Sequence, residues 1–396
     1  MPTRRATAAV RLAIAALATL AGLAPTASAA PATAPTTAPA ERGAVLDVGG
    51  RRAVVTRVDA LPFVQDGYTR RFTFDRADNP KLKLLRERYK LDEVVAGGRD
   101  EFGRQVLLLD WVHHRFAKFG RPSSKARGAL DVLAAVDDGH TFFCAHYADV
   151  LVSAAASLGW VDRPLALRRP DHLGSGATEH TSTEIWSNQY RRWVMFDPTF
   201  AMYAEKDGVP LNAVELRHEW FARDGRELTF VVGKERARYR KSDLPVLRGR
   251  FPGFGDLSLD ASALNVYAFI GFVPNTNLMD AGLDYGRMFI VQDAVGGATK
   301  WHKRDVPADP SRDPYFPIGQ AAVTLAADGP AIRVGLRTMT PNLKGFVSRV
   351  DGGPWVPVEG DAVAWTPHAG VNRLEVKTVN AFGVEGPVSV VEVEAR

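Results

Sequence analysis

The stretch that decides the fold is FCAHYADVLVSAAASLGWVDR at residues 143–163, followed by EHTSTE at 179–184 and WVMFDPT at 193–199. The first part is rich in alanine and reaches Gly159, a residue type that commonly closes helices. The pattern therefore predicts a helix with Cys144 in its first turn.

Strand-like segments follow this helix. Residues 165–167, 180–186 and 193–196 combine β-branched and aromatic side chains, and residues 187–192 separate the last two as a hairpin loop. A helix followed by antiparallel strands indicates the α+β fold class and argues against a doubly wound parallel sheet.

A lone thiol becomes a nucleophile when its surroundings favour the thiolate and supply a base. A helix N-terminus and a nearby imidazole both do so, and a carboxylate can orient the imidazole. His180 opens one hairpin strand and Asp197 closes the other, so pairing brings them to one end. One alternative is an inert buried thiol. The other is a zinc site that Cys144 shares with histidines, namely His140, His146 and His180.

Four co-ordered motifs resemble the core of the transglutaminase-like superfamily of papain-type thiol enzymes. They are Phe143-Cys144-Ala145, Leu158-Gly159-Trp160-Val161-Asp162-Arg163, Glu179-His180-Thr181-Ser182-Thr183-Glu184 and Trp193-Val194-Met195-Phe196-Asp197-Pro198-Thr199. Together with the preceding helix, the match covers residues 99–200. The resemblance implies a transglutaminase-like (papain-like) core in which Cys144 is the nucleophile, His180 the general base and acid, and Asp197 the group that orients the imidazole.

The resemblance also implies an enzyme. It would attack an amide carbonyl, form a thioester and pass the acyl group to water, as a peptidase or amidase, or to an amine, as a protein-glutamine acyltransferase. The backbone N–H of Cys144 would stabilise the oxyanion, with His140 and Trp111 as candidates for the second donor. The substrate would be a protein or peptide. Because the chain is predicted to be exported, this substrate could be associated with the cell wall. The rival hypothesis is a catalytically inactive scaffold that binds a cell-surface polysaccharide or protein.

The N-terminus carries targeting signals. Residues 1–29 contain three arginines, no acidic residue, an apolar run at 12–24 and the small-residue sequence Ala27-Ser28-Ala29. This is the pattern of a secretory signal peptide, which predicts a secreted or periplasmic protein. Residues 30–43 begin with an almost pure run of Ala, Pro and Thr and are predicted to form a linker.

Two domains are predicted after the linker. Residues 44–305 would form the catalytic domain, with N-terminal strands within 44–75 laid against the segment that follows. It also includes a one-faced helix from Phe102 to Phe119 capped by Asp100. A Pro- and Asp-rich joint leads to residues 318–396, whose short strands and turn signals predict an immunoglobulin-like or fibronectin-like β-sandwich.

Composition excludes several classes of function. The net charge of +5 over 396 residues includes three arginines of the signal peptide, and the remainder holds 47 basic and 45 acidic residues, which does not indicate a nucleic-acid partner. No segment after the signal peptide is long and apolar enough to predict a membrane span. A single cysteine rules out an intramolecular disulfide. No phosphate-cradling or dinucleotide motif occurs, so no cofactor is predicted.

Overall fold

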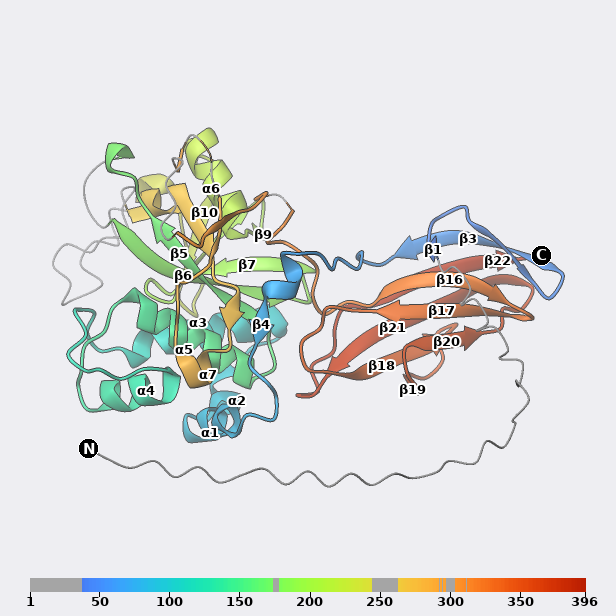
Figure 1. The fold of residues 1–396 in the computed structure, drawn as a ribbon, viewed down its shortest axis with the longest axis horizontal. Helices are drawn as coiled ribbons and strands as arrows, with labels where there is room; N and C mark the ends of the chain where they lie inside the picture. The colour runs from blue at the N-terminus through green and yellow to red at the C-terminus, as the bar shows by residue number, and fades with distance from the viewer. Residues whose placement is uncertain are drawn as a thin grey trace, which may run out of the picture. The chain divides into compact units, whose positions relative to one another are not determined.

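The computed structural model describes residues 38–173, 178–243, 263–291, 293, 295–296, 303–310 and 312–396. The predicted signal peptide and most of the predicted linker lie outside these residues. The described chain is a mixed α+β structure, which confirms the predicted class (Figure 1). In these ranges no helix has the length and apolar character needed to cross a membrane.

A six-stranded sheet in the order β15-β14-β12-β5-β6-β7 forms the centre of the α+β part. Its strands are β5 (Asp162–Arg168), β6 (Glu179–Ser187), β7 (Arg192–Phe196), β12 (Phe269–Phe272), β14 (Phe289–Ile290) and β15 (Val306–Pro307). The predicted strands correspond to β5, β6 and β7, which pair antiparallel in sequence order. The hairpin that carries the candidate residues is therefore confirmed.

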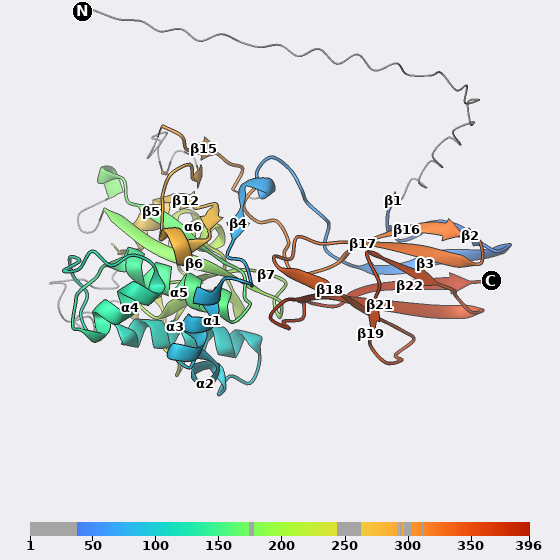
Figure 2. The same ribbon diagram turned by 60° about the horizontal axis from the view of Figure 1, so that its bottom comes forward.

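Five helices pack against one face of this sheet, and both ribbon views group them on the same side of β5 and β6 (Figures 1 and 2). They are α1 (Pro80–Arg88), α2 (Leu91–Val95), α3 (Glu101–Arg115), α4 (Ala129–Asp137) and α5 (Cys144–Ser157). Helix α5 contacts α1, α3, α4 and β6. Its alanines are mostly buried because small side chains let so many elements approach one helix.

Helix α3 begins where the sequence predicted and ends earlier. The Asp100 carboxylate accepts a hydrogen bond from the Gly103 N–H at 2.7 Å, which confirms the cap. The helix ends at Arg115, because Phe116 has extended backbone angles of φ −90° and ψ 103°. Phe116 and Phe119 still enter the core from a loop, where Phe119 forms a parallel bridge with Phe142. The spacing of apolar residues that predicted the helix extends to Phe119 because the loop after Arg115 is also buried.

A smaller layer covers the other face of the central sheet. It contains a sheet in the order β11-β10-β8-β9 and helix α6 (Ala213–Ala222), which Asn212 and Glu215 cap reciprocally. The strands are β8 (Met202–Lys206), β9 (Val209–Pro210), β10 (Thr229–Val232) and β11 (Ala237–Tyr239). Shorter elements are η1 (Thr69–Arg71), η2 (Asp171–Leu173), η4 (Ala263–Ala268), α7 (Leu278–Ala281) and the parallel pair β4 (Thr73–Phe74) and β13 (Asn275–Thr276).

The C-terminal part consists of two sheets that share one apolar core. Their orders are β1-β16-β17-β20 and β19-β18-β21-β22-β3-β2. The strands are β1 (Ala38–Pro39), β2 (Val45–Val48), β3 (Arg51–Asp59), β16 (Ala322–Asp328), β17 (Ala331–Arg337), β18 (Leu343–Val350), β19 (Val356–Val358), β20 (Ala362–Trp365), β21 (Gly370–Asn380) and β22 (Ser389–Ala395). A two-sheet arrangement agrees with the predicted sandwich, whose immunoglobulin-like type stays a prediction.

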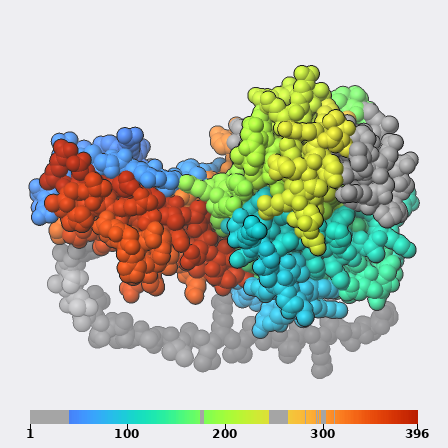
Figure 3. Space-filling model, turned by 180° about the vertical axis from the view of Figure 1, so that it is seen from behind, coloured from blue at the N-terminus to red at the C-terminus, as the bar shows by residue number. Residues whose placement is uncertain are grey.

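The N-terminal strands differ from their predicted place. Strand β3 pairs with β22, with Val58 opposite Val391, and β2 continues the same sheet. The blue N-terminal strands accordingly lie beside the red C-terminal ones (Figure 3). Alternation fixes which face of a strand is buried but not which strand it pairs with. Residues 45–59 therefore belong with the C-terminal sheets, and not with the segment that follows them.

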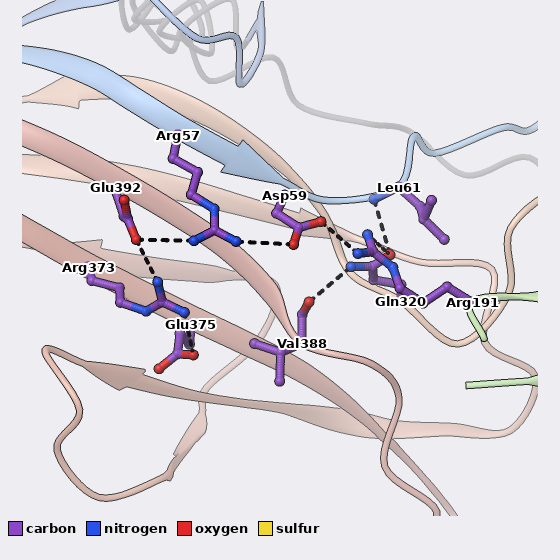
Figure 4. Close-up of polar contacts among 9 residues, drawn as sticks. All are labelled: Arg57, Asp59, Leu61, Arg191, Gln320, Arg373, Glu375, Val388 and Glu392. Atoms are coloured by element: carbon purple, nitrogen blue, oxygen red, sulfur yellow. Dashed lines mark hydrogen bonds and ion pairs between the residues drawn. The ribbon is translucent and has the colours of Figure 1, made fainter. Parts of the chain in front are cut away.

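Arg191 joins the two parts of the chain. It lies in the turn between β6 and β7 with φ +54°, and its guanidinium donates to the Asp59 carboxylate at 2.6 Å and to Gln320 Oε1 at 3.1 Å (Figure 4). The same Gln320 oxygen accepts from the Leu61 N–H, and its amide nitrogen donates to the Val388 carbonyl. One end of the β6–β7 hairpin is thus anchored to the C-terminal sheets.

Candidate active site

Cys144 is the first residue of α5, as predicted. Phe143 before it has extended angles of φ −113° and ψ 178°, and no side chain caps this helix end. The N–H groups at a helix start stabilise negative charge, which favours a thiolate at this position. The thiol is partly exposed, while neighbouring Phe142 is fully buried and holds the approach to the helix in place.

The β6–β7 hairpin brings His180 and Asp197 together. Thr183 pairs with Phe196, so the register sets Asp197 across from Ser182, on the same face as His180. The His180 Nε2 atom lies 2.7 Å from Asp197 Oδ2, and their side chains are 10% and 1% exposed. The structure therefore places this predicted pair in direct contact.

Cys144 and Asp197 both influence the imidazole. Burial lowers the pKa of His180, but the Asp197 carboxylate and, to a lesser degree, the nearby Cys144 outweigh it and raise the pKa to about 10. Because Nε2 is engaged by Asp197, the other ring nitrogen is left for Cys144. The ring is then an imidazolium at neutral pH, a charge that stabilises a neighbouring thiolate.

The Asp197 carboxylate is held from its other side. Its Oδ1 accepts the Thr199 N–H at 3.0 Å, and its backbone pairs with Met202 through bonds of 2.7 and 3.0 Å. Ala201 takes the left-handed conformation, φ +49°, that this tight turn requires. The side chain is thus fixed before any substrate binds, which is what an orienting group needs.

Two residues without a sequence signal border the site. His113 on α3 contacts the Thr199 carbonyl through Nδ1 at 3.0 Å, and burial lowers its pKa. The Tyr285 hydroxyl lies 2.6 Å from Thr181 Oγ1, beside His180, and its pKa is raised by burial and also by the charge of Cys144. Tyr285 follows Cys144 by more than 100 residues and belongs to no motif, so only the fold could reveal it.

The two candidates for the second oxyanion donor have neighbours of their own. His140 Nδ1 lies 2.9 Å from Ser123 Oγ, and Trp111 packs edge-on against Tyr89 with ring centroids 6.0 Å apart. Both assignments stay predictions. The helix N-terminus at Cys144 still supplies the first donor.

The histidines of the alternative zinc site are dispersed. The His146 ring packs on Phe142 and Phe143 at 4.7 and 4.9 Å, while His140 contacts Ser123. Within the described ranges, no three His, Cys, Asp or Glu side chains have an arrangement that could hold a metal ion.

Two other motif residues form the support beneath the hairpin. Arg163 on β5 pairs in register with Glu184 on β6, and two guanidinium nitrogens reach Glu184 Oε2 at 2.9 and 2.6 Å. Both side chains are 0% exposed. Glu184 Oε1 accepts from the Ala213 N–H and the Tyr315 hydroxyl, both at 2.8 Å. These residues fix the hairpin and are remote from the thiol chemistry.

The His180–Asp197 pair predicts a pH-dependent stability. Because folding raises the pKa of His180 from 6.5 to about 10, the pair's contribution is complete below pH 6.5 and is lost as pH rises through 10. We expect the free energy of unfolding to fall over this range in urea titrations. Asp197→Asn should remove much of that slope, whereas Asp137→Asn, at a half-exposed surface pair, should keep it. Equal slopes in all three proteins would contradict the coupling.

Comparisons with known proteins add little. No family model and no curated protein matches the sequence. The chain is similar to a crystal structure of a candidate cysteine protease from Cytophaga hutchinsonii, at 16% identity and a TM-score of 0.26. The alignment covers 38% of this chain and 49% of that one, so the match spans about half of its length. A TM-score this low does not show a shared fold, and the function proposed below rests on the geometry of the site.

Proposed function

We propose that this protein is a thiol-dependent amide hydrolase or acyltransferase of the transglutaminase-like type. The observation that carries the proposal is the arrangement of Cys144, at a helix N-terminus without a side-chain cap, near the buried His180–Asp197 pair. A nucleophile, a base within reach and a fixed third group are the parts that covalent acyl transfer requires.

The reaction follows from these positions. The Cys144 thiolate attacks the amide carbonyl, and the N–H groups of the helix end stabilise the oxyanion. As the C–N bond breaks, His180 donates its proton to the leaving amine, and a thioester remains on Cys144. Water or a second amine then attacks the thioester while His180 accepts its proton. The carboxylic acid or new amide leaves, and the thiolate–imidazolium pair is restored.

We propose hydrolysis as the main course, with a protein or peptide as substrate, and transfer to an amine as the alternative. The predicted signal peptide places the reaction outside the cytoplasm, where a cell-wall-associated substrate is accessible. Product analysis of a peptide library distinguishes the two courses, because hydrolysis yields a free acid and transfer yields a new amide. A scaffold without activity would leave the library unchanged.

The single cysteine makes the decisive test direct, since covalent labelling by a thiol-reactive amide probe reports on Cys144 alone. We expect one equivalent of label on the wild-type protein and none on Cys144→Ala. His140→Ala, outside this arrangement, should label like the wild type and serves as the matched control. Equal labelling of wild type and Cys144→Ala, or no labelling of either, would remove the nucleophile from the proposal.

A further inference from the structure

A cavity of about 280 Å³ opens directly beside the candidate nucleophile. Its walls include Phe143 and Ala145, the two neighbours of Cys144 in the chain, and Gly128 at the start of α4. Residues 282–283 and Tyr285, from the loop after α7, close the opposite side. The hydroxyl of Tyr285 binds Thr181, next to His180, so the cavity and the thiol share one border.

One polar group in the wall of this cavity is the carboxylate of Asp149, in the second turn of α5. Asp149 is only 4% exposed, and its Oδ1 atom has no hydrogen-bond partner. Among the residues that the structure describes, no basic side chain is paired with Asp149 or counts among the groups that shift its pKa. A buried carboxylate oxygen without a donor is unfavourable, and a bound group that donates to it would relieve that cost.

The charges around Asp149 favour a positively charged hydrogen-bond donor in the cavity. Burial raises its pKa to about 7, and the nearby Asp75, whose own pKa burial raises to about 6, adds to this effect. A cation at Asp149 offsets this repulsion, whereas a second carboxylate would increase it. Arg127 also borders the cavity, but its side chain is exposed, so water screens its charge.

The remaining walls suit an alkyl chain. Phe143, Leu283 and Ala145 are apolar, and Phe143 is 37% exposed at the entrance. The Nδ1 atom of His146 is buried without a hydrogen-bond partner and can also accept from a donor. Apolar walls with a few convergent polar groups are the usual form of a side-chain pocket.

We propose that this cavity, the Asp149 pocket, binds the ammonium group of a lysine-like side chain adjacent to the carbonyl that Cys144 attacks. This inference rests on the proposed function, because it names the substrate class of the same site. The alkyl part of the side chain lies against Phe143 and Leu283, and the ammonium group donates to Asp149.

The test uses peptidyl acyloxymethyl ketones, in which a thiolate displaces the carboxylate leaving group and forms a thioether. Two probes differ only in the side chain next to the ketone, which is lysine in one and norleucine in the other. We expect the lysine probe to label the wild-type full chain about tenfold faster or more, the effect of a charged hydrogen bond. Asp149→Asn should bring the two rates close together.

Controls separate the pocket from the fold and from the chemistry. Asp162→Asn removes another fully buried acid that does not line the pocket, and it should keep the lysine preference. Iodoacetamide, which has no such side chain, should label Asp149→Asn as fast as the wild type. Should Asp149→Asn not fold, the two probes on the wild type still decide the question.

The outcomes distinguish the two proposals. If neither ketone labels Cys144, the proposed function fails. If both label at equal rates, or norleucine is preferred, the thiol chemistry stands and the ammonium pocket is wrong. A lysine preference that survives Asp149→Asn would move recognition to another residue and overturn the inference.

Discussion

Replacing Arg163 by methionine is expected to destabilise the protein more than any other single change considered. The substitution leaves the Glu184 carboxylate charged inside a fully buried site, and breaking such pairs costs about 3–5 kcal/mol. Methionine retains an unbranched side chain for packing but also loses the cation–π contacts with Trp193 and Phe272, whose ring centroids lie 4.0 and 4.7 Å from the guanidinium carbon. The free energy of unfolding from urea titration measures the loss.

Two further variants separate charge from packing. Arg76→Met breaks an exposed pair with Asp78 at 2.8 Å and should cost far less stability, because water screens this pair. Adding Glu184→Gln to Arg163→Met removes the unpaired charge and keeps an acceptor for Tyr315, so part of the stability should return. An Arg163→Met loss no larger than that of Arg76→Met would show that the buried pair is not the main support of the hairpin.

The second large effect concerns the reactivity of the thiol at acidic pH. An imidazolium at His180 favours the thiolate of a neighbouring thiol, so we expect alkylation of wild-type Cys144 by iodoacetamide to change little between pH 6 and 8. In His180→Ala that charge is gone, and an ordinary thiol with a pKa of about 8.5 is only about 0.3% ionised at pH 6. The rate at pH 6 should therefore fall by up to roughly 300-fold.

The pH profile distinguishes this effect from general damage. In His180→Ala the rate should rise steeply as pH approaches 8.5, the behaviour of a free thiol. His113→Ala removes another partly buried imidazole nearby, whose Nδ1 contacts Thr199 and not the thiol, and should keep the flat profile. Overlapping profiles for the wild type and His180→Ala would show that the imidazole does not activate Cys144.

Local patterns in the sequence were enough to predict Cys144 at a helix start and the proximity of His180 and Asp197, whereas the approach of that helix to the pair was implied by the family resemblance. The helix start at Cys144 follows from composition and Gly159, and the hairpin register follows from two short apolar strands. Since side chains alternate along strands, these two facts already set His180 and Asp197 on one face.

Features that depend on distant pairing could not be predicted. Asp149 looks like any polar residue of an alanine-rich helix until the loop at 282–285 closes over it. Arg163 and Glu184 were visible as parts of separate motifs, but their shared register emerges only when β5 and β6 pair. The partner of β3 was missed for the same reason, because its burial pattern fits many sheets equally well.

The pairing of β3 with β22 affects how the chain folds during its synthesis. Val58 leaves the ribosome more than 300 residues before its partner Val391. The β22-facing edge of β3 therefore stays unpaired until synthesis is almost complete, and such long-range pairing slows folding and exposes strand edges. Loss of the residues of β22 would leave β3 paired with β2 alone. A C-terminal truncation should therefore impair the N-terminal strands as much as the C-terminal ones.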